Sequence, residues 1–141
     1  MNSPFASLSG LCAFTLAAAG LALGASGGDT KRAQTGPWGT LGIAMEVTES
    51  GARIEFDCAH GTVGEPIFLD SEGRFDVKGL HFREHGGPIR EGEEAKGEPV
   101  RYVGQVTGDT MTLTIKPEGS ETAIGSYKLV HGKAGRIRKC L

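Results

Sequence analysis

The stretch from residue 52 to residue 60 alternates between apolar and polar side chains, and it constrains the fold more than any other part of the chain. A period of two is typical of a β-strand that has one face on a core and the other in water. The residues expected to face the core are Ala52, Ile54, Phe56, Cys58 and His60. The sequence therefore predicts a half-buried strand here.

Similar short apolar runs, separated by turns rich in Gly, Asp and Ser, continue to the C-terminus. The expected strands start near Trp38, Ala52, Ile67, Arg74, Val100, Met111, Tyr127 and Ile137. Short strands at hairpin spacing predict an all-β fold, either a barrel or a two-sheet sandwich. The mostly sequential connections favour a small, closed or nearly closed antiparallel barrel of about eight short strands, with an interior filled by side chains.

For two of these strands the sequence predicts further detail. The first is expected to run on without a break from Trp38, and one of its faces consists of Leu41, Ile43, Met45 and Val47. In the fourth, the apolar residues change parity at Gly79, because Phe75 and Val77 are followed by Leu80 and Phe82. A bulge at Gly79 would bring both pairs to the same face.

The N-terminal segment is typical of an export signal. Residues 8–25 carry no charge and are rich in Leu, Ala and Gly, and small residues near Ala25 suit cleavage. The basic residue that usually begins a signal is absent, and an uncleaved membrane anchor is the rival interpretation. We expect a signal peptide at 1–25, a flexible leader at 26–37 and a single β-barrel domain at 38–141. The location is then secreted or periplasmic, without stable membrane insertion after cleavage.

The cysteine count predicts one disulfide. Cys12 lies inside the expected signal, and Leu11 before it departs from the small residue that lipid attachment requires. Removal of the signal leaves Cys58 and Cys140, an even pair in an oxidising compartment. Their bridge would close a loop of about 80 residues and stabilise the fold by roughly 4 kcal/mol through loop entropy.

Charge and motifs argue against several classes of function. The formal net charge is −2, whereas nucleic-acid-binding domains usually carry an excess of basic residues. The sequence contains no Gly-x-Ser-x-Gly elbow, phosphate-binding loop, paired-histidine zinc motif or dinucleotide-binding fingerprint. We therefore expect no enzymatic activity, no cofactor and no nucleic-acid partner.

The longest expected loop is the strongest candidate for a binding surface. It runs from Glu84 to Glu98, is polar and charged, and lies beside His81 and His85. Long polar loops on a rigid scaffold are frequent sites of function. We expect the binding residues to be His81, Glu84, His85 and Arg90.

Two catalytic alternatives depend on how the fold arranges these side chains. The set that could hold zinc or copper, if the chain bends, is His60, His81 and His85 with Glu84 or Asp57. Cys58 and His60 lie on the same expected strand face, about 7 Å apart at Cα. A free Cys58 thiol could then be activated by the imidazole as a nucleophile.

Gly36-Pro37-Trp38 resembles the Gly-x-Trp motif that opens the first strand of lipocalins and related calycin barrels. In that family the Trp closes one end of the barrel beneath a basic residue of the last strand, a role that Arg136 or Arg138 would take here. The resemblance implies an eight-stranded up-and-down barrel. It also implies export, a disulfide and the binding of small apolar ligands.

A second resemblance is to small periplasmic inhibitors of lysozyme and of proteases. Phe56-Asp57-Cys58 and Lys139-Cys140 are similar to the aromatic-x-Cys strand and the C-terminal cysteine of the membrane-associated lysozyme inhibitors. The sequence thus indicates an exported, non-catalytic binding domain for a small ligand or an extracytoplasmic protein. An inhibitor-like barrel is the alternative, and a metal- or thiol-dependent enzyme is the rival class.

Overall fold

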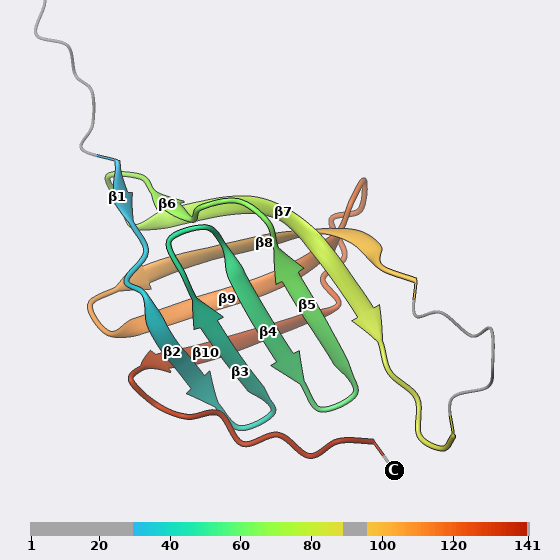
Figure 1. The fold of residues 1–141 in the computed structure, drawn as a ribbon. Helices are drawn as coiled ribbons and strands as arrows, with labels where there is room; N and C mark the ends of the chain where they lie inside the picture. The colour runs from blue at the N-terminus through green and yellow to red at the C-terminus, as the bar shows by residue number, and fades with distance from the viewer. Residues whose placement is uncertain (1–29, 89–95, 141) are drawn as a thin grey trace, which may run out of the picture.

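The computed structural model describes residues 30–88 and 96–140, which form an all-β fold (Figure 1). The signal peptide expected at residues 1–25 lies outside these ranges. Within the ranges, no helix is long and apolar enough to cross a membrane. Part of the expected leader is structured, since Lys31–Arg32 forms strand β1, Ala33 is buried and β2 begins at Gly36.

Eight strands form a closed antiparallel barrel in the order β10-β2-β3-β4-β5-β7-β8-β9. They are β2 (Gly36–Thr40), β3 (Ile43–Val47), β4 (Ala52–Phe56), β5 (Ala59–Val63), β7 (Arg74–Arg83), β8 (Glu98–Thr107), β9 (Thr110–Pro117) and β10 (Gly125–His131). Apart from the closing pair β10–β2, each strand pairs with the barrel strand that follows it in the chain. The expected closed barrel is confirmed, and its topology is up-and-down.

The strands that make up the barrel differ from those that the sequence predicts. The expected first strand is a hairpin, because the chain turns at Leu41–Gly42 between paired Thr40 and Ile43. The expected strand 52–60 is also a hairpin, with its turn at Asp57–Cys58. Two other expected strands lie outside the barrel: β6 (Phe68–Leu69) pairs only with β1, and the C-terminal segment forms a single bridge at Arg136.

These two turns explain why the expected faces are wrong. A two-residue turn lies between two residues that pair on the same face, so the inward positions change from even to odd across it. Phe56 and Ala59 therefore both face the core, whereas Cys58 is exposed and His60 is half-buried on the outer surface. Leu41, expected on the same strand face as Ile43 and Met45, is 72% exposed at its turn.

Side chains fill the barrel interior, as expected. The largest fully buried residues are Trp38, Tyr102, Ile43, Met45, Ile54, Met111, Leu113, Ile115 and Leu129. The ring of Tyr102 lies against two inward-facing glycines, Gly61 and Gly79, and a Cβ at either position would overlap it. Its hydroxyl donates a hydrogen bond to the Leu80 carbonyl at 2.7 Å. The glycines thus make room for a tyrosine ring that extends from β8 over β7 to β5 on the inner face of the barrel.

The end of the barrel near the β3–β4 turn is covered by β1 and β6, which lie side by side in Figure 1. Ala33 donates a backbone hydrogen bond to the Ile67 carbonyl at 2.9 Å, and both residues are buried. Leu69 is buried as well, whereas Phe68 faces outward beneath the Arg32 guanidinium. This end is therefore closed by apolar packing.

Residues 133–140, which we call the C-terminal strap, run along the opposite end of the barrel (Figure 1). Arg136 exchanges backbone hydrogen bonds with Thr40 and Gly42, at 3.1 and 2.8 Å. Farther on, Cys140 donates its backbone N–H to the Asp57 carbonyl at 3.2 Å. The strap is fixed to the two turns that the sequence did not predict.

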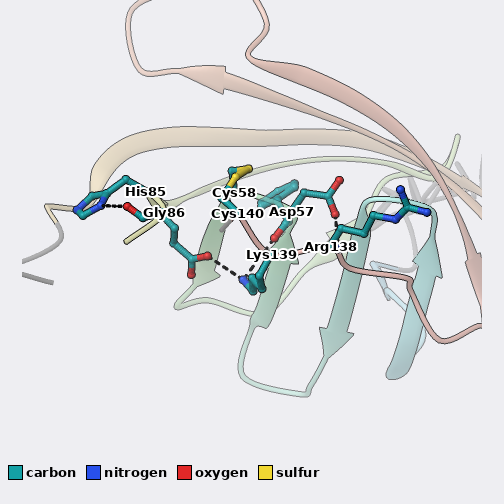
Figure 2. Close-up of a disulfide and its surroundings, with 9 residues drawn as sticks. Asp57, Cys58, His85, Gly86, Arg138, Lys139 and Cys140 are labelled. Atoms are coloured by element: carbon teal, nitrogen blue, oxygen red, sulfur yellow. Dashed lines mark hydrogen bonds and ion pairs between the residues drawn. A yellow bond between two sulfur atoms is a disulfide. The ribbon is translucent and has the colours of Figure 1, made fainter. Parts of the chain in front are cut away.

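The expected disulfide is present and ties the strap to the barrel (Figure 2). Cys58 and Cys140 are bonded across a sequence separation of 82 residues, with 5.2 Å between their Cα atoms. Closing so long a loop restricts the unfolded chain and contributes about 4.5 kcal/mol in the loop-entropy account.

Replacing Cys140 by Ser, with Cys58→Ser in the same chain to avoid a free thiol, should lower the Tm by roughly 10–20 °C. The measurement is thermal unfolding followed by circular dichroism under non-reducing conditions. Reductant added to the wild-type protein should bring its Tm to that of the double variant. Equal Tm values for the variant and the oxidised wild type would show that the bridge does not stabilise the fold.

Candidate functional site

An open pocket of about 580 Å³ lies at the strap end of the barrel. We call this end the mouth, and it is formed by the β2–β3 and β4–β5 turns, the end of β7 and the start of β10. The apolar lining includes Leu41, Phe56, Ile115, Ile124 and Tyr127, and the polar lining includes Asp57, His81 and Arg83. One end of the barrel is thus covered, and the other holds a mainly apolar pocket.

Three rings form much of this pocket. Phe56 packs against His81 and against Tyr127, each with 5.5 Å between ring centroids and with tilted planes. Burial and, secondarily, the negative charge of Asp57 raise the pKa of Tyr127, so its phenol stays protonated. Tilted rings of this kind offer both faces and edges to a further ring.

His81 is the polar group within this aromatic wall. Its side chain is only 5% exposed, and its Nδ1 has no hydrogen-bond partner within the described residues. Burial lowers the pKa of His81 below its usual 6.5, and the Arg83 and His60 charges act in the same direction, whereas Glu98 opposes them. The imidazole is therefore neutral at pH 7, with one ring nitrogen as donor and the other as acceptor.

The position of His81 follows from the continuous pairing of β7. The bulge expected at Gly79 is absent, since β7 and β8 remain in register from Arg74 to His81. The inward positions are Phe75, Val77, Gly79 and His81, and Leu80 faces outward. The sequence could have placed His81 in the interior if Gly79 had been interpreted as an inward-facing residue that leaves room for a large side chain such as Tyr102.

Glu84 is near the mouth but belongs to a chain of ion pairs on the outer surface. It accepts from His60 Nδ1 at 2.9 Å and from Lys139 Nζ at 2.8 Å, and Lys139 also reaches Glu55 at 2.7 Å. The hydrogen bond from Lys139 is the main cause that lowers the pKa of Glu84. The imidazole of His60 in turn stacks on Phe82 at 4.7 Å. These contacts attach the strap to β4 and β5.

The other expected site residues are dispersed. His85 is exposed, and its ring lies 3.1 Å from the Gly86 carbonyl (Figure 2). Arg90 lies outside the described residues. Trp38 is fully buried with its ring 4.8 Å from that of His131, and Arg136 is exposed on the strap.

The arrangement bears on both catalytic alternatives. His81 points inward whereas His60 lies on the outer surface, and no cluster of three or more His, Cys, Asp or Glu side chains suited to a metal occurs among the described residues. Cys58 is bonded to Cys140, so its sulfur is not a free thiol. Tyr127, Ile115 and Ile124 are pocket residues that the sequence did not single out, because pairing around a closed barrel is needed to bring them beside Phe56.

Comparison with family models found no match, and comparisons with curated proteins and with solved structures found none at a significant level. What the structure shares with the calycin barrels that residues 36–38 resemble is the closed eight-stranded architecture.

We expect His81→Leu to stabilise the protein by roughly 1–3 kcal/mol, because it replaces an unpaired buried polar group with an apolar one of similar size. The measurement is urea unfolding at pH 7.5, followed by fluorescence. Phe56→Leu is the matched control, and it should destabilise because it only removes packing. A destabilised His81→Leu protein would show that the imidazole is satisfied in the folded state.

The stability of the wild type should fall as the pH decreases from 7.5 to 5.5. The lowered pKa of folded His81 means that the unfolded chain takes up its proton first, from about pH 6.5 downward. The slope is at most about 1.4 kcal/mol per pH unit for this one proton. The same series on His81→Leu should lack this component, and parallel curves for the two proteins would contradict the assignment.

Proposed function

We propose that this protein is an exported, non-catalytic binding domain whose mouth pocket holds a small, largely apolar molecule with one polar atom directed at His81. The observation that carries the proposal is the buried His81 side chain, whose Nδ1 lacks a partner in the described chain while the residue lines an open pocket. Buried polar groups in folded proteins are almost always hydrogen-bonded. A bound ligand would supply the bond that the described residues do not, provided that the imidazole turns toward the pocket, because Nδ1 is fully buried as the ring stands.

The size and lining of the pocket support this proposal. Its volume of about 580 Å³ falls within the range of sites for small molecules. Such sites combine mostly apolar walls with a few polar groups that orient the ligand. Here Phe56 and Tyr127 supply aromatic surface and His81 supplies the orienting group. A ligand with a ring and one hydrogen-bonding atom suits this combination best.

Export is supported by the disulfide and by the uncharged N-terminal run. The Cys58–Cys140 bridge is exposed to solvent at both cysteines, and such a bridge persists in an oxidising compartment. Residues 8–25 have the composition of a signal peptide. The proposal therefore concerns ligands that occur in a periplasmic or extracellular space.

The test is nuclear magnetic resonance titration of the ¹⁵N-labelled protein with three ring-bearing probes: phenol, indole and benzoate. At least one probe should shift the ring nitrogens of His81 and the backbone amides of Phe56 and Tyr127. His81→Leu should weaken that binding at least tenfold, because the ligand loses its only directed polar contact. His85→Ala, which changes an exposed residue outside the pocket lining, is the control and should leave the Kd within about twofold. The proposal fails if no probe perturbs the pocket, or if both variants bind as the wild type does.

A further inference from the structure

The last barrel strand has an edge that is only partly paired. β10 forms a ladder with β9 from Gly125 to Val130, but it pairs with β2 only at Val130 and His131. β2 ends at Thr40, and the chain there turns into β3. Within the described residues, the stretch from Gly125 to Leu129 therefore has no ladder partner on the side away from β9.

The backbone groups on this edge can be identified from the alternation of an antiparallel ladder. His131 donates its N–H to the Asp109 carbonyl at 2.8 Å, which is on the β9 side of the strand. Backbone groups of successive residues point to opposite sides, so those of Lys128 and Ser126 point away from β9. Two residues thus present N–H and C=O groups in the spacing that a further strand would pair with.

The mouth pocket opens beside this edge. Gly125 and Tyr127 of β10 line one wall, and Leu41 and Gly42 of the β2–β3 turn line another. Each of these two walls has an exposed apolar side chain at the pocket opening, and Leu41 is 72% and Ile124 41% exposed. A polar strand edge therefore borders an apolar pocket.

The charge on the free edge itself is positive, whereas the pocket beside it carries both signs, with Arg83 and Asp57 in its lining. Lys128 is exposed on β10, Arg83 is exposed on the pocket wall and Arg138 is exposed on the strap. Among the described residues these three cations form no ion pair, whereas Asp57 accepts the backbone N–H of Arg138 at 2.8 Å. The positive charge of Lys128 on the edge favours an acidic residue in the partner.

We propose that an extended, acidic peptide segment adds to the free edge of β10 as a strand and inserts one apolar or aromatic side chain into the mouth pocket. The inference rests on the pocket of the proposed function but gives it a different occupant, a side chain of a bound peptide in place of a free small molecule. Strand addition obtains affinity from main-chain hydrogen bonds and specificity from a pocket for alternate side chains. An Asp or Glu near the inserted side chain would meet Lys128 or Arg83.

The test is selection from a phage-displayed random nonapeptide library, first on the wild type and then on two variants of one position. Lys128→Pro removes a backbone N–H from the free edge and no bond to β9, because that N–H points the other way. Lys128→Ala removes the charge and the side chain beyond Cβ but keeps the backbone N–H. Selected peptides should carry one apolar or aromatic residue with an acidic residue nearby. They should bind Lys128→Pro at least tenfold more weakly than the wild type, and Lys128→Ala only about two- to fivefold more weakly.

A measurement on the wild-type protein keeps the test decisive if Lys128→Pro fails to fold. Methylation of the peptide amides that face β10 should weaken binding at least tenfold, and the unmodified peptide should slow hydrogen exchange of the Ser126 and Lys128 amides. Equal binding of methylated and unmodified peptides would overturn strand addition. If no peptide is enriched while phenol, indole or benzoate still binds the pocket, the inference fails and the proposed function stands. If neither peptides nor probes bind, both fail.

Discussion

Closure of the barrel between β10 and β2 is the constraint on which the rest of the structure depends. Only two residue pairs join these strands, whereas β7 and β8 are joined by eight. Near the pairs, His131 packs on Trp38 and its Nε2 lies 2.9 Å from the Thr35 carbonyl. Because a short ladder holds weakly on its own, the closure relies on this packing and on the strap that follows β10.

The same short closure produces the pocket. Since β2 turns away after Thr40, the start of β10 stands apart from it, and the mouth is left open beside Tyr127. His81 lies in that opening, packed against Phe56 and with no hydrogen-bond partner for its Nδ1 among the residues that the structure describes. If β10 and β2 were paired along their whole length, β2 or the turn that follows it would lie against the pocket wall at Tyr127. Keeping a neutral imidazole there costs about 1–3 kcal/mol, which a purely structural barrel would avoid with a leucine.

The C-terminal strap joins the end of β10, where the barrel closes, to the residues around the mouth. Its disulfide partner Cys58 and its ion-pair partner Glu84 both lie at this end, and Lys139 joins Glu84 to Glu55. Glu84 and His60 thus hold the strap in position, and His60 acts on the pocket interior only through its charge, which lowers the pKa of His81. The ion pairs are partly exposed and contribute little each. The covalent bridge is the stronger restraint, because it keeps a loop of 82 residues closed in the unfolded chain as well.

The sequence by itself determined the all-β class, the barrel and the disulfide, because alternation, turn residues and the number of cysteines can be read or counted along the chain. It did not locate the turns at Leu41–Gly42 and Asp57–Cys58. Inward and outward side chains alternate on both sides of a two-residue turn, and the turn only moves the inward positions from even to odd residue numbers. That change put His60 outside. The continuous pairing of β7 with β8, in which Gly79 faces inward against Tyr102, put His81 inside. Only the tertiary structure decided which residues share the mouth, because the pocket joins side chains from β4, β7, β9 and β10 that meet only when the barrel closes.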